Sequence, residues 1–304
     1  LKEAIVAAGK DYKKLRNLKI TGEIKDLDFY FMRDEMDMLS ALNLKEVKIV
    51  AGESGSNGWY DSENKEDQIP VSAFYNSGGG KETLTNIVLP DKLTSIASMA
   101  FRECRNLTGS LIIPEGVVEI QQGAFTGCSS FNGTLSLPST LKYIGITSSS
   151  DLSDNEANDY SHGVFYECSF VCELVIPENV EVIRGFAFSE CKGLYGELRL
   201  PAGLKKLGAC AFGGCANLTG SITIPQGIVV IPDGCFEDCS FNGNLQLHDG
   251  IISIGNRAFK GNPLKGELVL PQSLTVLANE VFNGCDFSGE LKLPKGLVRI
   301  GNNA

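Results

Sequence analysis

Residues 198–215 read LRLPAGLKKLGACAFGGC, and residues 222–239, which begin 24 residues later, read ITIPQGIVVIPDGCFEDC. Both stretches carry apolar residues at alternate positions, then a proline, and further on a phenylalanine that is followed three residues later by a cysteine. A period of this size is typical of solenoids, in which one turn cannot bury its own apolar side chains and must stack on its neighbours. These two stretches therefore predict a repeat architecture.

Two marker residues recur in phase through most of the chain. Prolines stand at Pro90, Pro114, Pro138, Pro177, Pro201, Pro225, Pro271 and Pro294, and His248 fills the slot that lacks a proline. Phenylalanines that follow a small residue stand at Phe101, Phe125, Phe165, Phe188, Phe212, Phe236, Phe259 and Phe282. The steps are 23–24 residues, except where an inserted loop at about residues 145–160 lengthens one turn. Because the two markers keep the same phase, the chain is predicted to be a stack of 23–24-residue turns.

Each turn carries a local pattern with a physical meaning. Alternation such as Leu198-x-Leu200 predicts a short strand, and the proline that follows ends the strand because it has no N–H to donate to a ladder. A glycine two residues before most strands suits a turn that needs a positive φ. Cys172 replaces this glycine in one turn, which we expect to be strained or differently shaped.

These patterns predict one main parallel sheet. Its strands are expected near residues 18–20, 47–49, 87–89, 111–113, 135–137, 174–176, 198–200, 222–224, 245–247, 268–270 and 291–293. A shorter second row of strands is expected near residues 118–120 and their equivalents in other turns. Helix should be scarce, because 23–24 residues leave little room for one beside a strand.

The pattern resembles the leucine-rich repeat of the BspA-like (Treponema-type) family of bacterial surface proteins, over about residues 84–304. The resemblance implies a leucine-rich repeat solenoid that is right-handed and mostly β, with a parallel sheet on one face. Residues 1–69 fit the repeat loosely and include a stretch of mixed periodicity, residues 27–39, that we expect to be helical. We therefore predict an irregular α/β N-terminal capping region (1–69) and a solenoid (70–304) that ends midway through a repeat.

Composition limits the kinds of partner. The net charge is −10 and no basic run is present, which argues against nucleic acid, since phosphates need clustered lysine and arginine. The same acidity argues against an anionic membrane surface. No apolar run approaches the roughly 18 residues that a membrane-spanning helix needs, so no direct membrane insertion is predicted for this segment. The sequence begins at Leu1 without a methionine, so we expect an upstream piece to have been removed.

Residues that could carry catalysis or hold a metal are few. The chain has two histidines, His162 and His248, and the second occupies a proline slot of the repeat. No nucleophile elbow or metalloprotease motif occurs, and Gly78-Gly79-Gly80-Lys81 lacks the spacing of a phosphate-binding loop. An EF-hand needs glycine at its sixth position and glutamate at its twelfth, and the acids of the insert, Asp151, Asp154, Glu156 and Asp159, do not fit that pattern. We therefore expect no enzyme activity, no cofactor and no metal site.

Seven of the ten cysteines occupy one repeat position, three residues after the phenylalanine: Cys104, Cys128, Cys168, Cys191, Cys215, Cys239 and Cys285. We expect an inward-facing column of buried thiols, because free cysteine is among the most buried residue types. Adjacent turns bring Cα atoms to about 5 Å, which disulfide geometry tolerates, so disulfides and a metal site stay open as alternatives. Cys210 lies outside the column and should be the most exposed thiol.

Two surfaces are candidate partner-binding sites. If the leucines of each strand point inward, the residues between and before them face outward, and on two adjacent turns these include Glu173, Val175, Glu197 and Arg199. The two glutamates should repel each other, which a basic group on a partner could relieve. The other candidate is a polar Gly/Ser-rich loop that carries Trp59 beside Tyr60, and aromatic residues are enriched at binding hot spots. We favour the sheet face, because docking to a rigid surface loses less entropy.

Three classes of function compete for this sequence. A non-catalytic protein-binding module is favoured by the extended surface and by the lack of catalytic motifs. The resemblance implies a cell-surface or secreted, extracytoplasmic bacterial protein whose ligand is an unknown host or bacterial surface protein, with adhesion as its role. The alternative is a passive structural spacer that holds another domain off the cell surface. An enzyme or a carbohydrate-processing accessory is the class with the least support.

Overall fold

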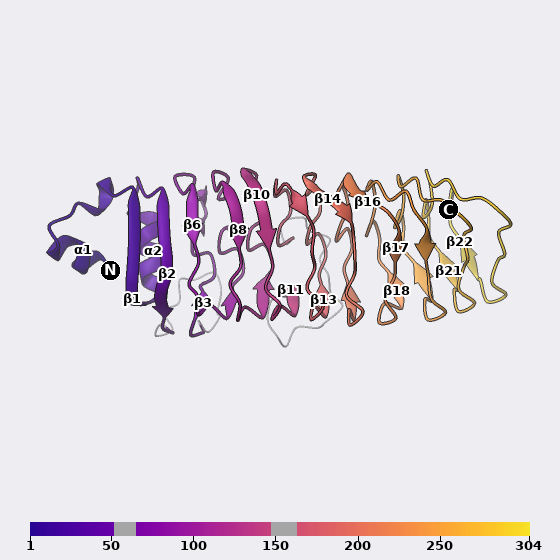
Figure 1. The fold of residues 1–304 in the computed structure, drawn as a ribbon, viewed down its shortest axis with the longest axis horizontal. Helices are drawn as coiled ribbons and strands as arrows, with labels where there is room; N and C mark the ends of the chain where they lie inside the picture. Colours follow the sequence, from indigo (N-terminus) through magenta and orange to yellow (C-terminus); the bar gives the residue numbers. More distant parts are fainter. Residues whose placement is uncertain (52–64, 147–162) are drawn as a thin grey trace.

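The computed structural model describes residues 1–51, 65–146 and 163–304, so most of the predicted inserted loop lies outside the described residues. Figure 1 shows the strands stacked side by side along the long axis of an elongated molecule, with the two termini toward opposite ends. Strands of successive turns pair in parallel, and about 11 turns follow one another at a spacing of about 24 residues. The predicted leucine-rich repeat solenoid, mostly β and with few helices, is confirmed.

The first row of strands corresponds to the predicted main sheet, and its later members lie in the upper half of Figure 1. Its members are β1 (Asn17–Ile24), β2 (Ala41–Ile49), β6 (Asn86–Val88), β8 (Gly109–Ile112), β10 (Phe131–Ser136), β12 (Cys172–Glu173), β14 (Leu194–Glu197), β16 (Asn217–Thr219), β17 (Ile222–Thr223) and β19 (Leu245–Gln246). Pairing divides the row into β1-β2-β6, β10-β8, β12-β14-β16 and β17-β19. Among the described residues no strand forms at 174–176, 198–200, 268–270 or 291–293, where four were predicted; on the first two of these turns the strands β12 and β14 end just before the predicted positions, at Glu173 and Glu197. Gly266 and Gly289, which precede the last two of these positions, have φ of 81° and 95°, but Gly220 with φ of 83° precedes a strand that does form, so the glycine alone does not explain the missing strands.

The second row of strands lies below the first in Figure 1. Its members are β3 (Gln68–Ile69), β7 (Ser95–Ile96), β9 (Glu119–Gln121), β11 (Tyr143–Ile146), β13 (Val182–Ile183), β15 (Lys206–Leu207), β18 (Val230–Ile231), β20 (Ser253–Ile254), β21 (Val276–Leu277) and β22 (Arg299–Ile300). They form a six-stranded sheet, β15-β13-β11-β9-β7-β3, and a four-stranded sheet, β18-β20-β21-β22. The predicted second row is confirmed, and it is interrupted less often than the first.

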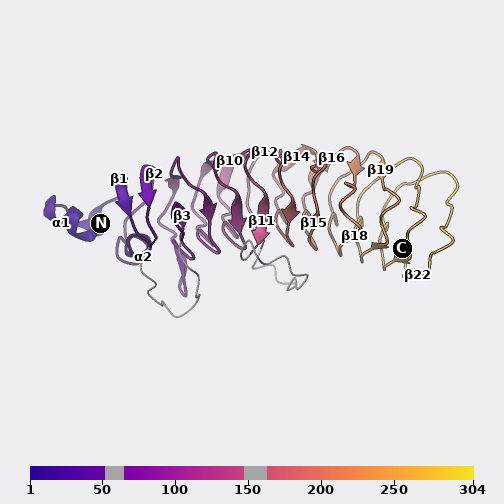
Figure 2. The same ribbon diagram turned by 90° about the horizontal axis from the view of Figure 1, so that it is seen from below.

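Helices are confined, within the described residues, to the N-terminal end of the stack, as Figure 2 shows. They are α1 (Lys2–Ala7), the 3-10 helix η1 (Tyr12–Lys14) and α2 (Asp26–Asp34). The position of α2 confirms the helix expected within residues 27–39. A short antiparallel hairpin of β4 (Tyr75–Asn76) and β5 (Gly79–Gly80) completes the regular elements.

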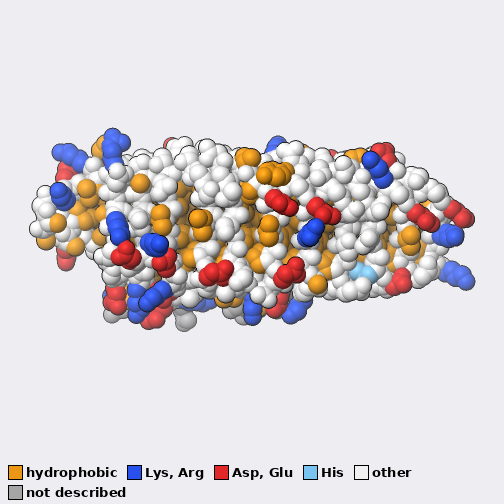
Figure 3. All heavy atoms as spheres, viewed as in Figure 1, with side chains coloured by type: hydrophobic (Ala, Val, Ile, Leu, Met, Phe, Trp, Pro, Cys, Tyr) orange, Lys and Arg blue, Asp and Glu red, His pale blue; other side chains and the backbone are white. Residues whose placement is uncertain are grey.

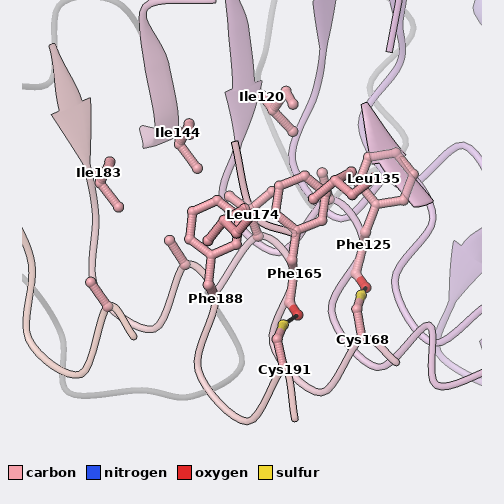
Figure 4. Packing of buried hydrophobic residues seen from close by; sticks show 14 of the residues in the cluster. Ile120, Phe125, Leu135, Ile144, Phe165, Cys168, Leu174, Ile183, Phe188 and Cys191 are labelled. Carbon is pink, nitrogen blue, oxygen red and sulfur yellow. Dashed lines mark hydrogen bonds between the residues drawn. The ribbon is translucent and has the colours of Figure 1, made fainter. Parts of the chain in front are cut away.

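A column of stacked phenylalanines runs through the core of the solenoid. Its members are Phe74, Phe101, Phe125, Phe165, Phe188, Phe212, Phe236, Phe259 and Phe282. Ring centroids of successive members lie, for example, 5.1 Å apart between Phe101 and Phe125 and 5.5 Å apart between Phe188 and Phe212, with nearly parallel planes. Figure 4 shows Phe125, Phe165 and Phe188 side by side in this arrangement. All members except Phe282 are buried, which confirms the predicted phenylalanine core.

The cysteine column accompanies the phenylalanines and forms hydrogen bonds with their backbone. Each column thiol donates to the carbonyl oxygen of the phenylalanine one turn earlier, as Cys191 does to Phe165 at 2.9 Å and Cys215 to Phe188 at 3.0 Å (Figure 4 shows the first). All ten cysteines are free, so the expectation of buried thiols holds for the column, although Cys285 is only partly buried. Where the repeat has Asn262 instead of cysteine, the amide Nδ2 donates to Phe236 O in the same way. The repeat position therefore needs a buried hydrogen-bond donor.

The turn around each phenylalanine directs its N–H groups toward the next turn. Around Phe212, the N–H groups of Cys210, Phe212 and Gly214 donate to the carbonyls of residues 233, 235 and 237 at 2.9, 3.0 and 2.8 Å. Cys210 and Gly214 have φ of 53° and 76°, so this geometry is held in the left-handed region even where the residue is not glycine. In this column, hydrogen bonds between turns therefore run in one direction, and the first turn is left with carbonyls that no earlier turn can pair.

Side chains of α2 supply donors for those carbonyls. The Arg33 guanidinium donates through Nη1 to Ser72 O at 2.8 Å and to Tyr75 O at 3.0 Å, and the Tyr30 hydroxyl donates to Val71 O at 3.2 Å. Buried backbone carbonyls need such partners, because leaving one unpaired costs the free energy of a lost hydrogen bond. The helix α2 thus covers the N-terminal end of the stack by apolar packing and also donates hydrogen bonds to backbone carbonyls there.

Glycine is required before the first-row strands for two different physical reasons, a positive φ and a close approach between turns, and only the first was predicted. Gly196 has φ of 91°, as expected for a left-handed turn. Gly133 has no positive φ, but a Cβ there would lie 2.4 Å from Ser110 Oγ on the preceding turn. Cys172 occupies the same slot without a positive φ and joins β12, and its buried Sγ accepts a hydrogen bond from Leu135 N. The strain that was expected as one of two outcomes is therefore absent at Cys172, whose backbone, like that of Gly133, has no positive φ.

The phenylalanine column gives the first test of the fold. Replacement of Phe212 by alanine should lower the free energy of unfolding by about 3–5 kcal/mol, the range for a fully buried aromatic residue, because it opens a cavity between two stacked neighbours. Phe282 is only partly buried, and Phe282→Ala should cost distinctly less. Urea denaturation of both variants measures the difference. A loss below about 1 kcal/mol at Phe212 would show that the inward face has been assigned wrongly.

Candidate functional site

The outer face of the first row exposes up to three side chains per turn. On two adjacent turns these are Val171, Glu173, Val175, Tyr195, Glu197 and Arg199, which we call the central patch. The buried residues between them, such as Leu174 and Leu198, point into the core, so the alternation of buried and exposed residues through β12, β14 and the residues beside them places the six side chains on the solvent side. Figure 3 shows acidic, basic and hydrophobic side chains gathered over the part of the face where β14 lies in Figure 1.

The charged residues predicted for this face are exposed on it, but only one of the two glutamates forms an ion pair with a described residue. Arg199 Nη2 donates to Glu197 Oε2 at 3.3 Å, and both side chains are mostly exposed. Such an exposed pair contributes little to stability. Glu173 makes no hydrogen bond or ion pair with any described residue. The structure thus brings the four predicted residues Glu173, Val175, Glu197 and Arg199 together, with one paired and one unpaired carboxylate.

Three exposed hydrophobic side chains lie among these charges. Val171, Val175 and Tyr195 are 55%, 69% and 50% exposed, which is high for residues of this type. Of these, Val171 and Tyr195 were missed by the sequence analysis, which followed the alternation only as far as the glycine slot. The signal was present, because both residues stand two positions before an outward-facing glutamate and therefore on the same face of the strand.

The turns on either side of the central patch carry uncharged polar residues. These are Asn132, Thr134 and Ser136 on one side and Thr219, Ser221 and Thr223 on the other. Several of these polar groups are already paired within the chain: the Thr134 and Ser110 hydroxyls lie 3.1 Å apart, and Thr223 Oγ1 donates to Gln246 Oε1 at 3.0 Å. The central patch is therefore chemically distinct from its immediate surroundings.

The other predicted surface cannot be compared with this one, because Trp59 and Tyr60 lie outside the described residues. The same holds for the acids of the insert and for His162. His248 has a structural role: its Nδ1 accepts from Gly250 N at 3.0 Å, and Nε2 lies 3.0 Å from Ile228 O, to which it donates in the matching tautomer. The imidazole thus forms hydrogen bonds with backbone groups just after a strand, which agrees with the rung-end role predicted from its place in a proline slot.

The glycine-rich segment before Lys81 also has a structural explanation. A Cβ at Gly80 would lie 2.2 Å from the carbonyl carbon of Glu103, so only glycine allows the two turns to approach. Lys81 Nζ is buried and donates to Arg33 O and Met36 O near the end of α2. In the part of the chain that the structure describes, no group of three or more His, Cys, Asp or Glu residues could hold a metal ion. No helix of the described residues is long and apolar enough to cross a membrane.

The thiols are poorly suited to nucleophilic chemistry. Burial raises the pKa of Cys215 and Cys285 to about 12, and burial together with the nearby carboxylates of Glu237 and Asp233 raises the pKa of Cys210 to about 11. Because the thiolate is the reactive species, these groups are almost fully protonated at neutral pH. Cys210 is partly exposed, with its Sγ 3.8 Å from Asp233 O, and together with Cys285 it is one of the two cysteines that are not buried, in line with its place outside the column.

The chain is similar to known repeat proteins. Residues 65–156, 158–288 and 264–304 match the family described as the BspA type leucine-rich repeat region, with six copies. A leucine-rich repeat protein from Bacteroides ovatus is 28% identical, with a TM-score of 0.46, over 69% of this chain and 55% of that one, so the chain spans about half of its length. The T. pallidum leucine-rich repeat protein is 23% identical, with a TM-score of 0.42, over 79% of this chain and 81% of that one. A leucine-rich cell surface protein from Faecalibacterium prausnitzii is 18% identical, with a TM-score of 0.41, over 93% of this chain and 79% of that one. No curated protein matches the chain.

The thiol of Cys210 provides a pH-dependent test of this local structure. Because its pKa is raised to about 11, its alkylation rate in the native protein should rise about tenfold for each pH unit between roughly 8 and 10, in step with the thiolate fraction. Iodoacetamide labelling followed by peptide mass spectrometry measures the rate at each cysteine. The fully buried column thiols, such as Cys191, serve as the unreactive control. A rate at Cys210 that levels off near pH 9 would contradict the assigned environment.

Proposed function

The chain belongs to the family of BspA-type leucine-rich repeat proteins, and from that premise we propose that it is a non-catalytic module that binds another protein at the central patch. The family match indicates no enzymatic family, and the solenoid offers a long face whose backbone is fixed by stacking on both sides. A surface of this kind binds without first having to become ordered, so little entropy is lost on docking.

The observation that carries the proposal is the composition of the central patch. Val171, Val175 and Tyr195 are exposed where solvent normally meets polar side chains, and clustered exposed apolar residues mark interaction sites. They lie beside the charges of Glu173 and Glu197, which can orient a partner and speed its approach. Neither neighbouring turn has this mixture, so docking at the patch would be position-specific along the repeat.

A passive spacer is the second candidate function. The molecule is elongated with its termini toward opposite ends (Figure 1), and the polar groups beside the patch are satisfied within the chain. Such a rod could hold another domain away from a surface without binding anything itself. A spacer, however, has no need of three exposed hydrophobic side chains in one place.

A pull-down from host extracellular-matrix and bacterial envelope extracts separates these functions. The immobilised chain should retain a protein at low salt. The double variant Glu173→Ala, Glu197→Ala should retain less of it, because the acids attract the partner. Its melting temperature should stay almost unchanged, since both side chains are exposed.

A matched control removes an exposed pair from the second row, Glu181→Ala with Lys205→Ala, and should bind as the unaltered chain does. Retention that survives the Glu173/Glu197 change but disappears in Trp59→Ala would place the site on the Trp59–Tyr60 loop instead. Retention of no protein at all would favour the spacer.

We further propose that the protein acts outside the cytoplasm, on the bacterial surface or after secretion, in adhesion or another protein–protein contact. The BspA-type family and the acidic character of the chain support this location. Fractionation of cells that make the full-length protein should find it in the envelope or the medium and sensitive to added protease. Recovery in the cytoplasm alone would count decisively against the proposal.

A further inference from the structure

The acidic residues of the first-row face differ in their neighbours on the same strand. Four glutamates share one outward position of the repeat: Glu173, Glu197, Glu267 and Glu290. Glu197 and Glu290 are each followed two residues later by a basic partner, Arg199 at 3.3 Å and Lys292 at 3.7 Å. Glu267 has Lys265 two residues before it in the sequence. Glu173 is the exception, because valines stand both two residues before it and two residues after it.

The surroundings of Glu173 hold its side chain over the next turn. Its Cγ lies 3.2 Å from the position that a Cβ on Gly196 would occupy, so its methylene groups rest on that glycine. In the strand pairing it lies opposite Tyr195, whose ring is half exposed. With Val171 and Val175 on its own turn, the carboxylate is presented on a surface of exposed apolar groups. It makes no ion pair or hydrogen bond with a residue that the structure describes.

We infer that Glu173 is the subsite for one cationic side chain of the partner, an arginine or lysine flanked by apolar residues, docking between Val171, Val175 and Tyr195. The inference rests on the proposed function and names the chemistry of the partner. It follows from charge complementarity: the other three acids at this repeat position have a basic residue within two positions in the sequence, and two of them form an ion pair with it, whereas the neighbours of Glu173 are both valines.

Two physical effects favour a cation over a neutral group here. When a partner covers the valines, water leaves the carboxylate, and an ion pair strengthens as the local dielectric falls. The same burial would penalise an unpaired carboxylate, so a partner without a cation would be disfavoured. An arginine can in addition lie against the Tyr195 ring, which attracts cations over its face. Apolar residues beside the cation would cover the two valines.

A peptide selection tests the inference with a defined probe. A library of seven randomised residues is selected against the whole chain, and the enriched sequences should carry arginine or lysine with apolar residues beside it. One such peptide is then synthesised, and its dissociation constant is measured by fluorescence anisotropy at low and high salt. Binding should weaken as salt rises, and Glu173→Gln should weaken it about tenfold or more, the effect of losing a charged hydrogen bond.

Matched variants separate the possible outcomes. Glu267→Gln removes an acid at the same repeat position and should leave affinity unchanged, and Val175→Asp should abolish binding if the peptide lies on the patch. Peptides that bind the patch without basic residues, or that are indifferent to Glu173→Gln, overturn the inference while leaving the proposed function standing. A selection that yields no peptide sensitive to Val175→Asp also overturns it. The proposed function is decided separately, by retention of protein in the pull-down.

Discussion

The stacking of one phenylalanine on the next is the contact on which the rest of this structure depends. A single turn of 23–24 residues has too little volume to bury a ring, two strand leucines and an isoleucine by itself, so burial is achieved only between turns. Each turn therefore contributes one phenylalanine ring to a continuous column. The cysteine column then satisfies the carbonyls that the stacking brings into the core, as Cys191 does for Phe165. Asn262 shows that the requirement is for a donor and not for sulfur.

Because neighbouring turns share these inward contacts, the outward positions are free to differ. One turn pairs Glu197 with Arg199, whereas the preceding turn holds Glu173 between two valines at the same repeat position. Differences of this kind change the chemistry of the face while the stacked core beneath it is retained. The stacked core therefore carries the stability, and the proposed recognition role falls to the outward side chains of the central patch.

Much of this arrangement could be predicted from the sequence, because a repeat reports each structural requirement many times. The two rows of strands, the buried phenylalanines, the thiol column and the outward direction of Glu173 and Arg199 follow from the period and from alternation, whereas the exact ends of the first-row strands do not. The features that could not be predicted depend on contacts between turns that do not recur in every repeat and therefore produce no periodic pattern in the sequence. Gly133 is glycine because of the approach of Ser110, and Arg33 binds carbonyls about 40 residues later in the chain. The pairing of Glu197 but not Glu173 needed coordinates as well.

Oxidative footprinting tests the central claim, that a protein partner docks on the first-row face at the central patch, most directly. Hydroxyl radicals modify exposed side chains. Tyr195 is half exposed on this face, and Val229 and Ile252, which lie near the second row, are exposed to a similar extent and serve as controls. With the partner captured from envelope or matrix extracts, the account predicts that Tyr195 becomes protected while Val229 and Ile252 are modified as in the free chain. Unchanged modification of Tyr195, with protection confined to the second row, would contradict it.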